Sequence, residues 1–377
     1  MKPVVLLEIL LIALGPVAGR WLHKKGWLPD WISPVVFCYA VGIAAGNLPG
    51  VTINTEVASA AMQASLLLAL PLLLFPTDLL GQIRSAGKPL LAFGLCAAAG
   101  ILSTALVAWA FRHHLTDSWR LAGMLTGMYT GGTPNMQAIG IALGASENEL
   151  IAVNAADIFG GGVYLVLLSS FLPRLLLKWL PAYRVAGVAE AAEIGDNPKF
   201  GARDVLFSAG LAVLVVAGSV GLCLLFTGKL EDIALIILCL TTLGLTLSFV
   251  PSVRNRPGSF ETGEFLLLAF CVALGLQADF AALIETGQGI ILFSCLALGG
   301  TIILHFLFCR VFGIDRDTCL IASTAGIYGP AFIGQVAAVI GNRRLVFNGI
   351  ALGLLGYAVG NYLGISLGWL LKWWLIS

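Results

Sequence analysis

The segment GMYTGGTPNMQAIG, residues 127–140, interrupts a stretch that otherwise has the composition of a membrane helix. It places two adjacent glycines, a proline and several hydrogen-bonding side chains in apolar surroundings. Proline removes a backbone donor and stops a helix from continuing, while glycine permits backbone geometry that is closed to other residues. In lipid an unpaired backbone group is so costly that irregular backbone occurs only against protein or a wet cavity. The segment therefore predicts a helix that is broken deep in a membrane-embedded region.

The composition places the whole chain in a membrane. Of its 377 residues, 59% are hydrophobic and 11% are charged, whereas soluble domains carry about 25% charged residues. Apolar runs of about 20 residues, the length that crosses a hydrocarbon core of about 30 Å, recur from end to end. We predict an all-α polytopic protein that crosses the cell (inner) membrane many times. The expected spans are 3–20, 31–48, 57–81, 88–111, 120–143, 149–171, 205–226, 230–249, 260–284, 287–311, 317–340 and 345–374.

Charge and cysteine content exclude several classes of protein. The formal net charge is +1 and no basic stripe is present, so we expect a lipid bilayer as partner and no nucleic acid. The eight cysteines stand singly without a CxxC pair, which indicates neither a zinc site nor a disulfide framework. His305 stands alone in its span, and we expect it to be a satisfied core residue. No resident cofactor is expected.

The chain divides into two similar halves, 1–180 and 205–377, around a polar linker at 181–204. Three features recur in the same order: a span that ends in a lone aspartate (67–94 and 265–294), a Gly- and Pro-containing break, and a following span that aligns Asn154 with Asn348. The core helices would be 88–171 in the first repeat and 287–374 in the second. Internal repeats with interrupted helices at matching positions are typical of secondary transporters.

Charges indicate that the two repeats are inverted. The turn after the first repeat's third span carries Arg84 and Lys88, whereas its counterpart carries Glu285 and no cation. By the positive-inside bias these turns face opposite sides of the membrane. Inversion requires an odd number of crossings between matching spans, but twelve spans give six. We therefore expect about 12–13 transmembrane helices, with either a hidden crossing near 149–180 or a miscounted span elsewhere.

The two breaks are the candidate binding site. Pro134 suits the first turn of a new half-helix, whose free N–H groups would attract a carboxylate or another anion. The carbonyl groups that end the preceding half-helix suit a small cation. A second break, 323–330, offers the same arrangement from the other repeat, so that the half-helix ends would converge near the midplane; packing kinks are the alternative. The candidate substrate-binding residues are Thr130, Gly131, Gly132, Thr133, Pro134, Asn135, Ser323, Thr324, Gly326, Tyr328, Gly329, Asn348 and Asn361.

Asp157 is the strongest single candidate for a functional residue, because a carboxylate inside an apolar span is costly unless it faces a wet or paired site. Asn154 lies three residues earlier on the same helical face. The two side chains form a candidate sodium site or a proton-carrying site, and Thr130 and Gln137 are further candidates for ion coupling. The alternative is a protonated carboxyl that bonds neighbouring backbone. For Asn348 and Asn361, a role in hydrogen bonds between helices is as good an explanation as a place in the binding site.

The breaks and the span that follows them resemble a known family. TGGTPNMQAIG followed by NAADIFGGGVYL, with YGPAFIGQVAA and GYAVGNYLG nearer the C-terminus, is similar to the YjcL-like membrane proteins, which are catalogued as a domain of unknown function. The resemblance covers essentially the whole chain. That family is grouped with bile-acid symporters, sodium–glutamate symporters and cation–proton antiporters.

The resemblance implies a fold and a mechanism. The fold would have a panel or scaffold domain and a core domain with two unwound helices that cross, here 120–143 and 317–340. It would work by an elevator-like movement, often as a homodimer. Asn154 and Asp157 occupy the place where antiporters of the group keep an acidic ion-binding pair. Asn154 departs from that pattern, because the antiporters have a second aspartate there. The sequence of the glycine-rich break also differs from that of the sodium–glutamate symporters. Both differences leave the coupling ion and the substrate open.

The function that these features favour is a sodium- or proton-coupled symporter of a small organic anion, such as an amino acid, a short peptide or cell-wall fragment, or another carboxylate. The alternative is a cation–proton antiporter with no organic substrate. An enzyme is not expected, because there is one convincing buried aspartate, no HExxH, and no serine–histidine pair placed for nucleophilic work. A channel is a further alternative. No GxxxxGK[ST] motif occurs, so transport would draw on an ion gradient.

Overall fold

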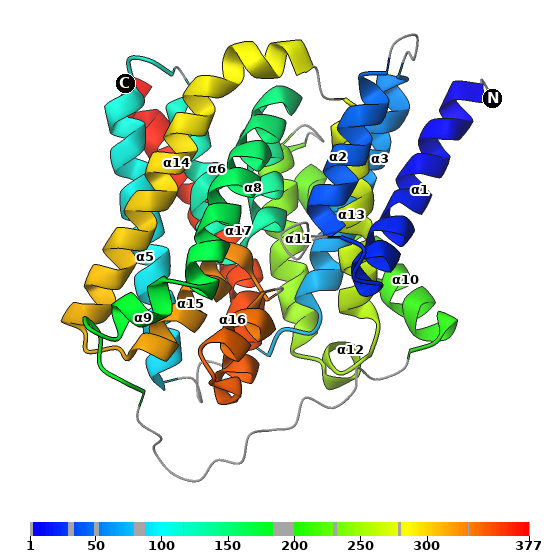
Figure 1. Cartoon of the computed structure of the whole chain (residues 1–377). Coiled ribbons are helices and arrows are strands. Elements are labelled where there is room, and N and C mark those ends of the chain that lie inside the picture. Colours follow the sequence, from blue (N-terminus) through cyan, green and yellow to red (C-terminus); the bar gives the residue numbers. More distant parts are fainter. Residues whose placement is uncertain are drawn as a thin grey trace.

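In the computed structural model, every regular element of the described residues is a helix (Figure 1). The described residues are 3–28, 34–48, 53–78, 87–115, 117–183, 200–228, 232–277, 280–330 and 332–376. The first half contains α1 (Pro3–Lys24), α2 (Pro34–Gly46), α3 (Thr55–Leu74), α5 (Gly87–Phe111), α6 (Ser118–Gly131), α7 (Thr133–Ala142), α8 (Glu147–Ser169) and α9 (Leu172–Leu176). The second contains α10 (Ala202–Thr227), α11 (Ile233–Ser248), α12 (Pro251–Arg254), α13 (Ser259–Leu276), α14 (Phe280–Val311), α15 (Arg316–Tyr328), α16 (Ile333–Val339), η1 (Arg343–Leu345) and α17 (Val346–Ile376).

The fold is that of an all-α polytopic membrane protein. Among the described residues, eight helices are long and apolar enough to span a membrane, and two apolar helices are shorter, Phe37–Gly46 and Ile233–Ser248. Large apolar side chains are exposed on the outer helices, as on α10, where Leu214 and Leu225 are more than two-thirds exposed. An apolar surface of this extent is typical of contact with lipid or with another protein, and the length and composition of these helices favour lipid. Each of the twelve expected spans corresponds to a helix or to a pair of half-helices.

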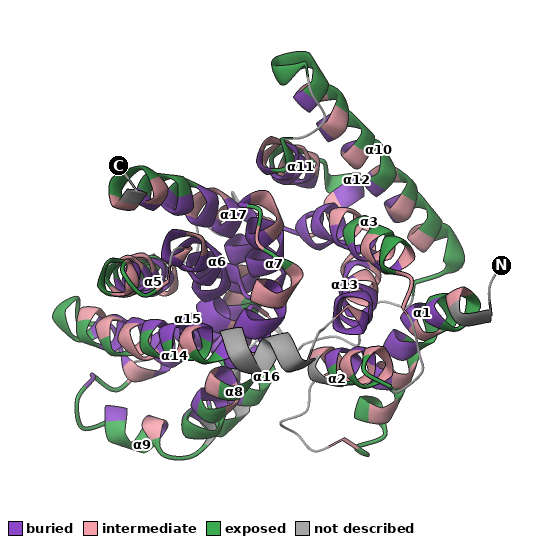
Figure 2. Cartoon of the chain, turned by 90° about the horizontal axis from the view of Figure 1, so that it is seen from above, coloured by how far each residue is buried: buried purple, intermediate pink, exposed green. Residues whose placement is uncertain are grey.

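The helices form two bodies, and each body takes helices from both halves of the chain (Figure 2). The scaffold body contains α1, α2, α3, α10, α11, α12 and α13; its helices pack closely where Gly42 meets Gly275. The hairpin body contains α5, α6, α7, α8, α14, α15, α16 and α17. The most deeply buried segments belong to this second body, where α6 and α15 are buried along nearly their whole length.

The helices expected at 120–143 and 317–340 are broken, but neither crosses the membrane. In the first, α7 turns back along α6, so that Gly127 lies against Ile139 and the Arg120 side chain donates to the Leu143 carbonyl at 3.2 Å. In the second, the Asn342 amide beyond α16 returns to the Asp317 carboxylate near the start of α15, at 2.9 Å. The expectation of two through-going, crossing helices is therefore corrected to two re-entrant hairpins. They enter from opposite ends of the molecule (Figure 1).

The hairpins remove the conflict between the span count and the inversion. A re-entrant hairpin leaves the membrane on the side where it entered, so the described helices of each half make an odd number of crossings, which inverts the second half relative to the first. In each hairpin a glycine with positive φ stands at the tip and another stands 12 residues later, Gly132 and Gly144 in the first, Gly329 and Gly341 in the second. The corresponding positions are thus 197 residues apart. Ser103 of α5 and Gly300 of α14 have the same separation and face each other, as expected near a two-fold axis.

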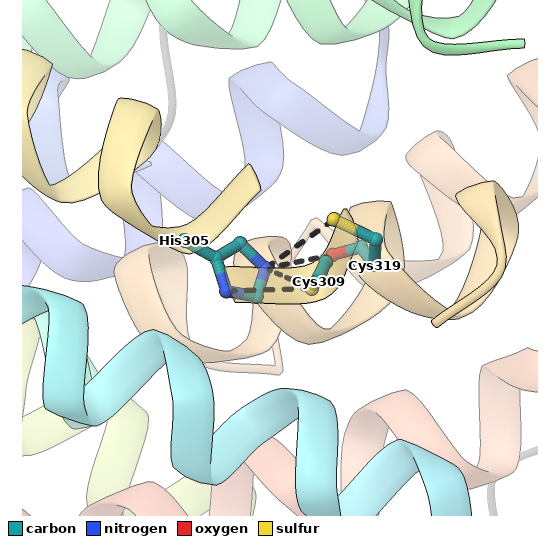
Figure 3. Close-up of side chains that lie close together, drawn as sticks. All are labelled: His305, Cys309 and Cys319. Atoms are coloured by element: carbon teal, nitrogen blue, oxygen red, sulfur yellow. Dashed lines mark hydrogen bonds between the residues drawn. The ribbon is translucent and has the colours of Figure 1, made fainter. Parts of the chain in front are cut away.

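His305 is a core residue, as predicted. Its side chain has no exposed area, and its Nε2 lies 3.2 Å from the carbonyl oxygen of Cys319. Cys309, one turn along α14, and Cys319 of α15 close around the ring (Figure 3). Asp78, the lone aspartate of the first repeat's segment 67–94, forms an ion pair with Arg254 at 3.1 Å. Its counterpart in the segment 265–294, Asp279, and Arg84 of the orientation prediction lie outside the described residues.

Candidate functional site

The tips of the two hairpins meet in the interior of the hairpin body. A Cβ atom added to Gly132 would lie 3.3 Å from the carbonyl carbon of Tyr328, and one added to Gly329 would lie 3.4 Å from the carbonyl oxygen of Gly131. The C-terminal ends of α6 and α15 therefore point at each other, with the start of α7 beside them. Helix ends carry partial charge, negative at the C-terminus and positive at the N-terminus. The contact between the tips thus concentrates both kinds of charge at one buried place.

Glycine is required at both tips because of the backbone conformation. Gly132 has φ 87° and ψ −169°, and Gly329 has φ 69° and ψ −155°. This region of backbone space is essentially closed to residues with a side chain. Each tip glycine ends its helix by donating its N–H to a carbonyl four residues earlier, at 2.7 Å for Gly132 and 3.0 Å for Gly329. The glycines recognised in the sequence thus mark the turning points of the hairpins.

A stripe of glycines on α17 lets the first hairpin approach it closely. Gly356 lies directly against the backbone of Thr130 and Gly131, and Gly360 lies against Asn135. Asn135 donates its side-chain amide to the Gly356 carbonyl at 2.8 Å. This bond fixes the first turn of α7 to α17, so the tip of the hairpin has a defined position.

Helix α8 holds the second hairpin. The Tyr328 hydroxyl donates to the Gly161 carbonyl at 2.6 Å, and the Ser323 hydroxyl bonds the Tyr164 hydroxyl at 2.7 Å. The rings of Tyr164 and Tyr328 are stacked, with centroids 6.1 Å apart. Two residues predicted from the second break, Ser323 and Tyr328, therefore connect α15 to the helix that carries the buried aspartate.

Asp157 lies on that helix beside the tip of the second hairpin. A Cβ added to Gly161 would be 3.4 Å both from an Asp157 carboxylate oxygen and from the Tyr328 ring. The phenols of Tyr39, Tyr129 and Tyr328 lie within electrostatic range of this carboxylate. Its Oδ1 atom is buried and makes no hydrogen bond within the described residues. Buried polar atoms are normally paired, and an exception needs an explanation.

Three other predicted residues also have buried acceptor oxygens without a hydrogen bond in the described part of the chain. Two belong to the first hairpin, Asn135 through Oδ1 and Gln137 through Oε1, and the third is the Oδ1 atom of Asn361 on α17. The Gln137 amide donates to the Tyr39 hydroxyl at 2.7 Å, which brings it into the neighbourhood of Asp157. The unpaired oxygens of Asp157, Asn135 and Gln137, like that of Asn361, are acceptors, so each would be satisfied by a cation or by a partner that donates hydrogen bonds.

Not every predicted residue lies at the tips. Thr130 and Thr324 donate their hydroxyls to carbonyls of their own helices, Thr126 and Leu320, at 2.7 Å. Asn154 likewise donates to Leu150 at 2.9 Å. The remaining predicted residues of the two breaks follow the tip glycines or precede them by one to three residues. They are Gly131, Thr133, Pro134 and Gly326.

The two asparagines of α17 lie away from the tips. Tip contacts are made at Gly353 and Gly356, whereas Asn348 is half-buried nearer the start of the helix. Asn361 donates to the Thr241 hydroxyl of α11 at 3.0 Å. This is a hydrogen bond between the two bodies, which is the alternative that the sequence left open for Asn361.

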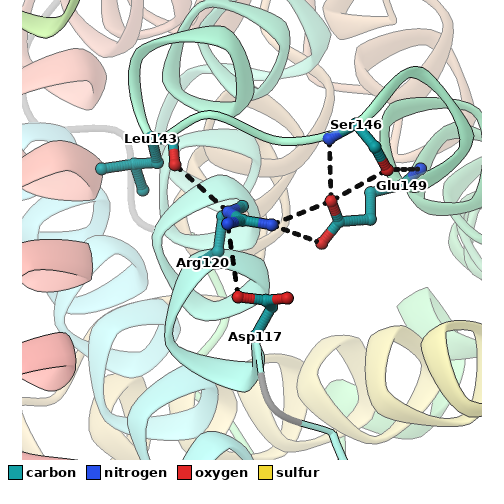
Figure 4. A network of polar contacts seen from close by, with 5 residues as sticks. All are labelled: Asp117, Arg120, Leu143, Ser146 and Glu149. Atoms are coloured by element: carbon teal, nitrogen blue, oxygen red, sulfur yellow. Dashed lines mark hydrogen bonds and ion pairs between the residues drawn. The ribbon is translucent and has the colours of Figure 1, made fainter. Parts of the chain in front are cut away.

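Ion-pair networks close the base of each hairpin. At the first base, Arg120 binds Glu149 with two bonds of 2.9 and 3.0 Å and lies 3.3 Å from Asp117, while the Glu149 carboxylate also accepts the backbone N–H of Ser146, the N-cap residue of α8 (Figure 4). At the second, Asp317 pairs with Arg316 and accepts the Asn342 amide. Charge-assisted bonds of this kind are stronger than neutral ones. The hairpins are thus secured at both ends.

A cavity of about 500 Å³ opens at the first base. Its lining includes Asp117, Arg120 and Glu149. The cavity is separate from the tips, and its one cation is already paired with two carboxylates. It therefore offers no free positive charge to an organic anion.

The tyrosines around the tips were not predicted from the sequence. Tyr39, Tyr129 and Tyr164 were overlooked, as was Tyr357, whose hydroxyl lies 3.1 Å from the Cβ position of Gly329. A usable signal exists, because the chain has only seven tyrosines and tyrosine in membrane proteins is enriched at the two membrane–water interfaces. Tyrosine within an apolar span is therefore a mark of a buried polar site.

Comparisons with known proteins place the chain in a family of membrane proteins. The chain is 25% identical over 377 residues to a protein of Bacillus subtilis (strain 168) described as "Uncharacterized membrane protein YjcL", and the match covers 95% of this chain and 94% of that protein. Residues 9–374 match a family described as "Protein of unknown function (DUF819)". The chain therefore belongs to the DUF819 family of membrane proteins.

Proposed function

We propose that this protein is a secondary active transporter that couples sodium or proton entry to the movement of a small organic anion. The observation that carries the proposal is the meeting of two re-entrant hairpin tips beside Asp157, whose buried oxygen has no partner among the described residues. Irregular backbone at membrane depth is tolerated where it lines a substrate or ion pathway. Discontinuous helices at the interface of inverted repeats are the sites at which secondary transporters bind their cargo.

The ends of the half-helices would supply binding sites of opposite partial charge for two ligands, the cargo and the coupling ion. The N-terminal turn of α7 would receive a carboxylate of the cargo, because its first N–H groups have no partner inside the helix. Asp157, with Asn154 and Gln137 near it, would receive the coupling ion. Amino acids, short peptides or cell-wall fragments, and other carboxylates all fit this requirement. No catalytic role and no resident cofactor are part of the proposal.

Transport would proceed by an elevator movement of the hairpin body against the scaffold body. Several side-chain hydrogen bonds join the two bodies, among them Gln137 to Tyr39, Ser59 to Glu147 and Asn361 to Thr241. Single hydrogen bonds of this kind contribute about 0.5–1.5 kcal/mol each, so such bonds can break and re-form during a cycle. The resemblance to the bile-acid symporter group supports this mechanism, and with it a homodimer in the inner membrane.

The test is uptake by purified protein in liposomes. Inward sodium and proton gradients are imposed separately, and accumulation of labelled amino acids, peptides and organic acids is measured. The proposal expects one gradient to drive uptake of one class of solute above the level of empty liposomes. Absence of gradient-driven uptake, together with single-channel currents in a planar bilayer, would contradict it.

A cation–proton antiporter is the second candidate, and one observation favours it. The orphan atoms at the tips are acceptors, including the Asp157 carboxylate oxygen, and a site made of acceptors binds cations without needing an anionic cargo. The same liposomes distinguish the two functions. An antiporter dissipates a pH gradient when sodium is added in the absence of organic solute, whereas the symporter requires the solute.

A further inference from the structure

A histidine and two cysteines from neighbouring helices form a cluster with the dimensions of a metal site. His305 and Cys309 stand one turn apart on α14, and Cys319 lies near the start of α15 (Figure 3). Their ligand atoms all lie within 4.8 Å of one another, and none of the three residues has exposed area. We propose that these three side chains bind one thiophilic closed-shell cation, Zn²⁺ or Cu⁺, deep in the hairpin body. The proposal is independent of the transport function.

The distances around the histidine match a coordination shell. Its Nε2 atom lies 3.7 Å from the Cys309 sulfur, 3.5 Å from the Cys319 sulfur and 3.2 Å from the Cys319 carbonyl oxygen. Metal–sulfur bonds of about 2.3 Å and metal–nitrogen or metal–oxygen bonds of about 2.0–2.1 Å place tetrahedral ligands about 3.6 Å apart for N and S, and about 3.4 Å apart for N and O. The carbonyl group keeps a second lone pair beyond its helical bond and completes a fourth ligand position.

Charge balance favours a soft cation at this depth. Two thiolates without a counter-charge would be costly to bury, but two thiolates, one neutral imidazole and Zn²⁺ form a neutral group, and Cu⁺ reduces the net charge of the same ligands to −1. The position of Cys319 at the fourth residue of α15 adds the favourable field of a helix N-terminus for negative charge. Thiolate and imidazole ligands select zinc and copper over magnesium or calcium, which prefer oxygen.

The cluster belongs to the second repeat alone. The positions 197 residues earlier are Ala108, Arg112 and Ala122, which offer no comparable ligand set. The repeat framework therefore does not require a histidine and two cysteines here. A bound ion would connect α14 to the first turns of α15 and so fix the outer end of the second hairpin, in addition to the Asp317 contacts at its base.

The test begins with metal analysis of protein purified without chelators. We expect about one zinc or copper ion per chain by mass spectrometry, and the element found distinguishes the two ions. Added Co²⁺ should replace zinc and give thiolate-to-cobalt charge-transfer absorption, while Cu⁺ is measured by competition with a chromogenic chelator. Removal of the ion should lower Tm, and Zn²⁺ or Cu⁺ alone should restore it.

Serine variants separate a metal site from a hydrogen-bonded core cluster. Cys309→Ser and Cys319→Ser nearly keep the size and hydrogen bonding of the thiol but remove the soft ligand, so each should lower bound metal at least tenfold. Cys223→Ser, at a buried cysteine of the scaffold body, should keep the wild-type metal content. Metal far below one ion per chain in the wild type after reconstitution, or serine variants that retain the ion, would overturn the proposal. A Tm of the metal-free protein that does not change when Zn²⁺ or Cu⁺ is added would also overturn the proposal.

Discussion

At the scale of single residues, the carboxylate of Asp157 is the group on which ion coupling depends. Asp157→Asn keeps the size of the side chain and removes the charge. Because a buried charge without a partner is destabilising, we expect the variant to be at least as stable as the wild type without ligand, and to lose ion-driven uptake down to the level of empty liposomes. Uptake and Tm are measured against sodium concentration and pH.

A matched control uses a carboxylate that lies at the surface. Glu56 stands exposed in the first turn of α3, so Glu56→Gln should leave uptake and its ion dependence unchanged. If Asp157→Asn showed the sodium and pH dependence of the wild type, Asp157 would have no part in coupling.

A second residue-scale prediction concerns the tip of the first hairpin. Gly132→Ala places a side chain in a backbone region that costs about 1–3 kcal/mol, and its Cβ would press on the Tyr328 backbone at 3.3 Å. We expect a lower Tm and a larger loss of uptake than the loss of folded protein explains. Gly210→Ala on α10, where nothing lies within 4 Å, should be neutral or stabilising by up to about 1 kcal/mol. Equal behaviour of the two variants would contradict a special role for the tip.

At the scale of elements, the ion pair at the base of the first hairpin should control its stability. Arg120 and Glu149 are each 16% exposed and bonded at 2.9 Å. Glu149→Gln should cost about 1–3 kcal/mol, since it removes charge-assisted bonds from a largely buried arginine. Glu264→Gln breaks a pair at 3.5 Å with side chains that are 35% and 42% exposed and should cost about 1 kcal/mol or less. Denaturant unfolding in detergent compares the two, and a larger cost at Glu264 would refute the prediction.

Most elements of the fold were predictable from local composition, but the direction of the half-helices was not. Hydropathy located the helices, and the glycines and prolines of residues 130–135 and 323–330 located both breaks. Composition carries no information on whether the chain continues or turns back after a break. Gly127 and Gly140, which let α6 and α7 lie side by side, have the same composition as packing glycines of a straight span. The conflict between span count and inversion was the one signal of a re-entrant hairpin.

The candidate site was predictable only where a residue conflicts with its local surroundings. Asp157 and the tip glycines conflict with an apolar helix, and they were found. Tyr39 and Tyr357 reach the tips from other helices, through packing that no local pattern reports. The same holds for Cys319, which meets His305 across two helices. Contacts between distant segments depend on how whole helices dock, and this information is spread over many weak contacts.

At the scale of the whole molecule, the two bodies must move relative to each other if the elevator mechanism operates. Ser59 of the scaffold body donates to Glu147 at the start of α8, at 3.2 Å, so cysteines at these two positions can be joined by a short bifunctional thiol reagent. We expect Ser59→Cys/Glu147→Cys to lose uptake after cross-linking and to recover it when a reducible linker is cleaved. The matched control joins two positions inside the scaffold body, Ser59→Cys/Gln277→Cys, which are also in hydrogen-bond contact. That link should leave uptake intact. Full activity of the cross-linked Ser59–Glu147 pair would show that the two bodies transport without sliding at this contact, and would leave only local opening of the hairpin tips as the route across the membrane.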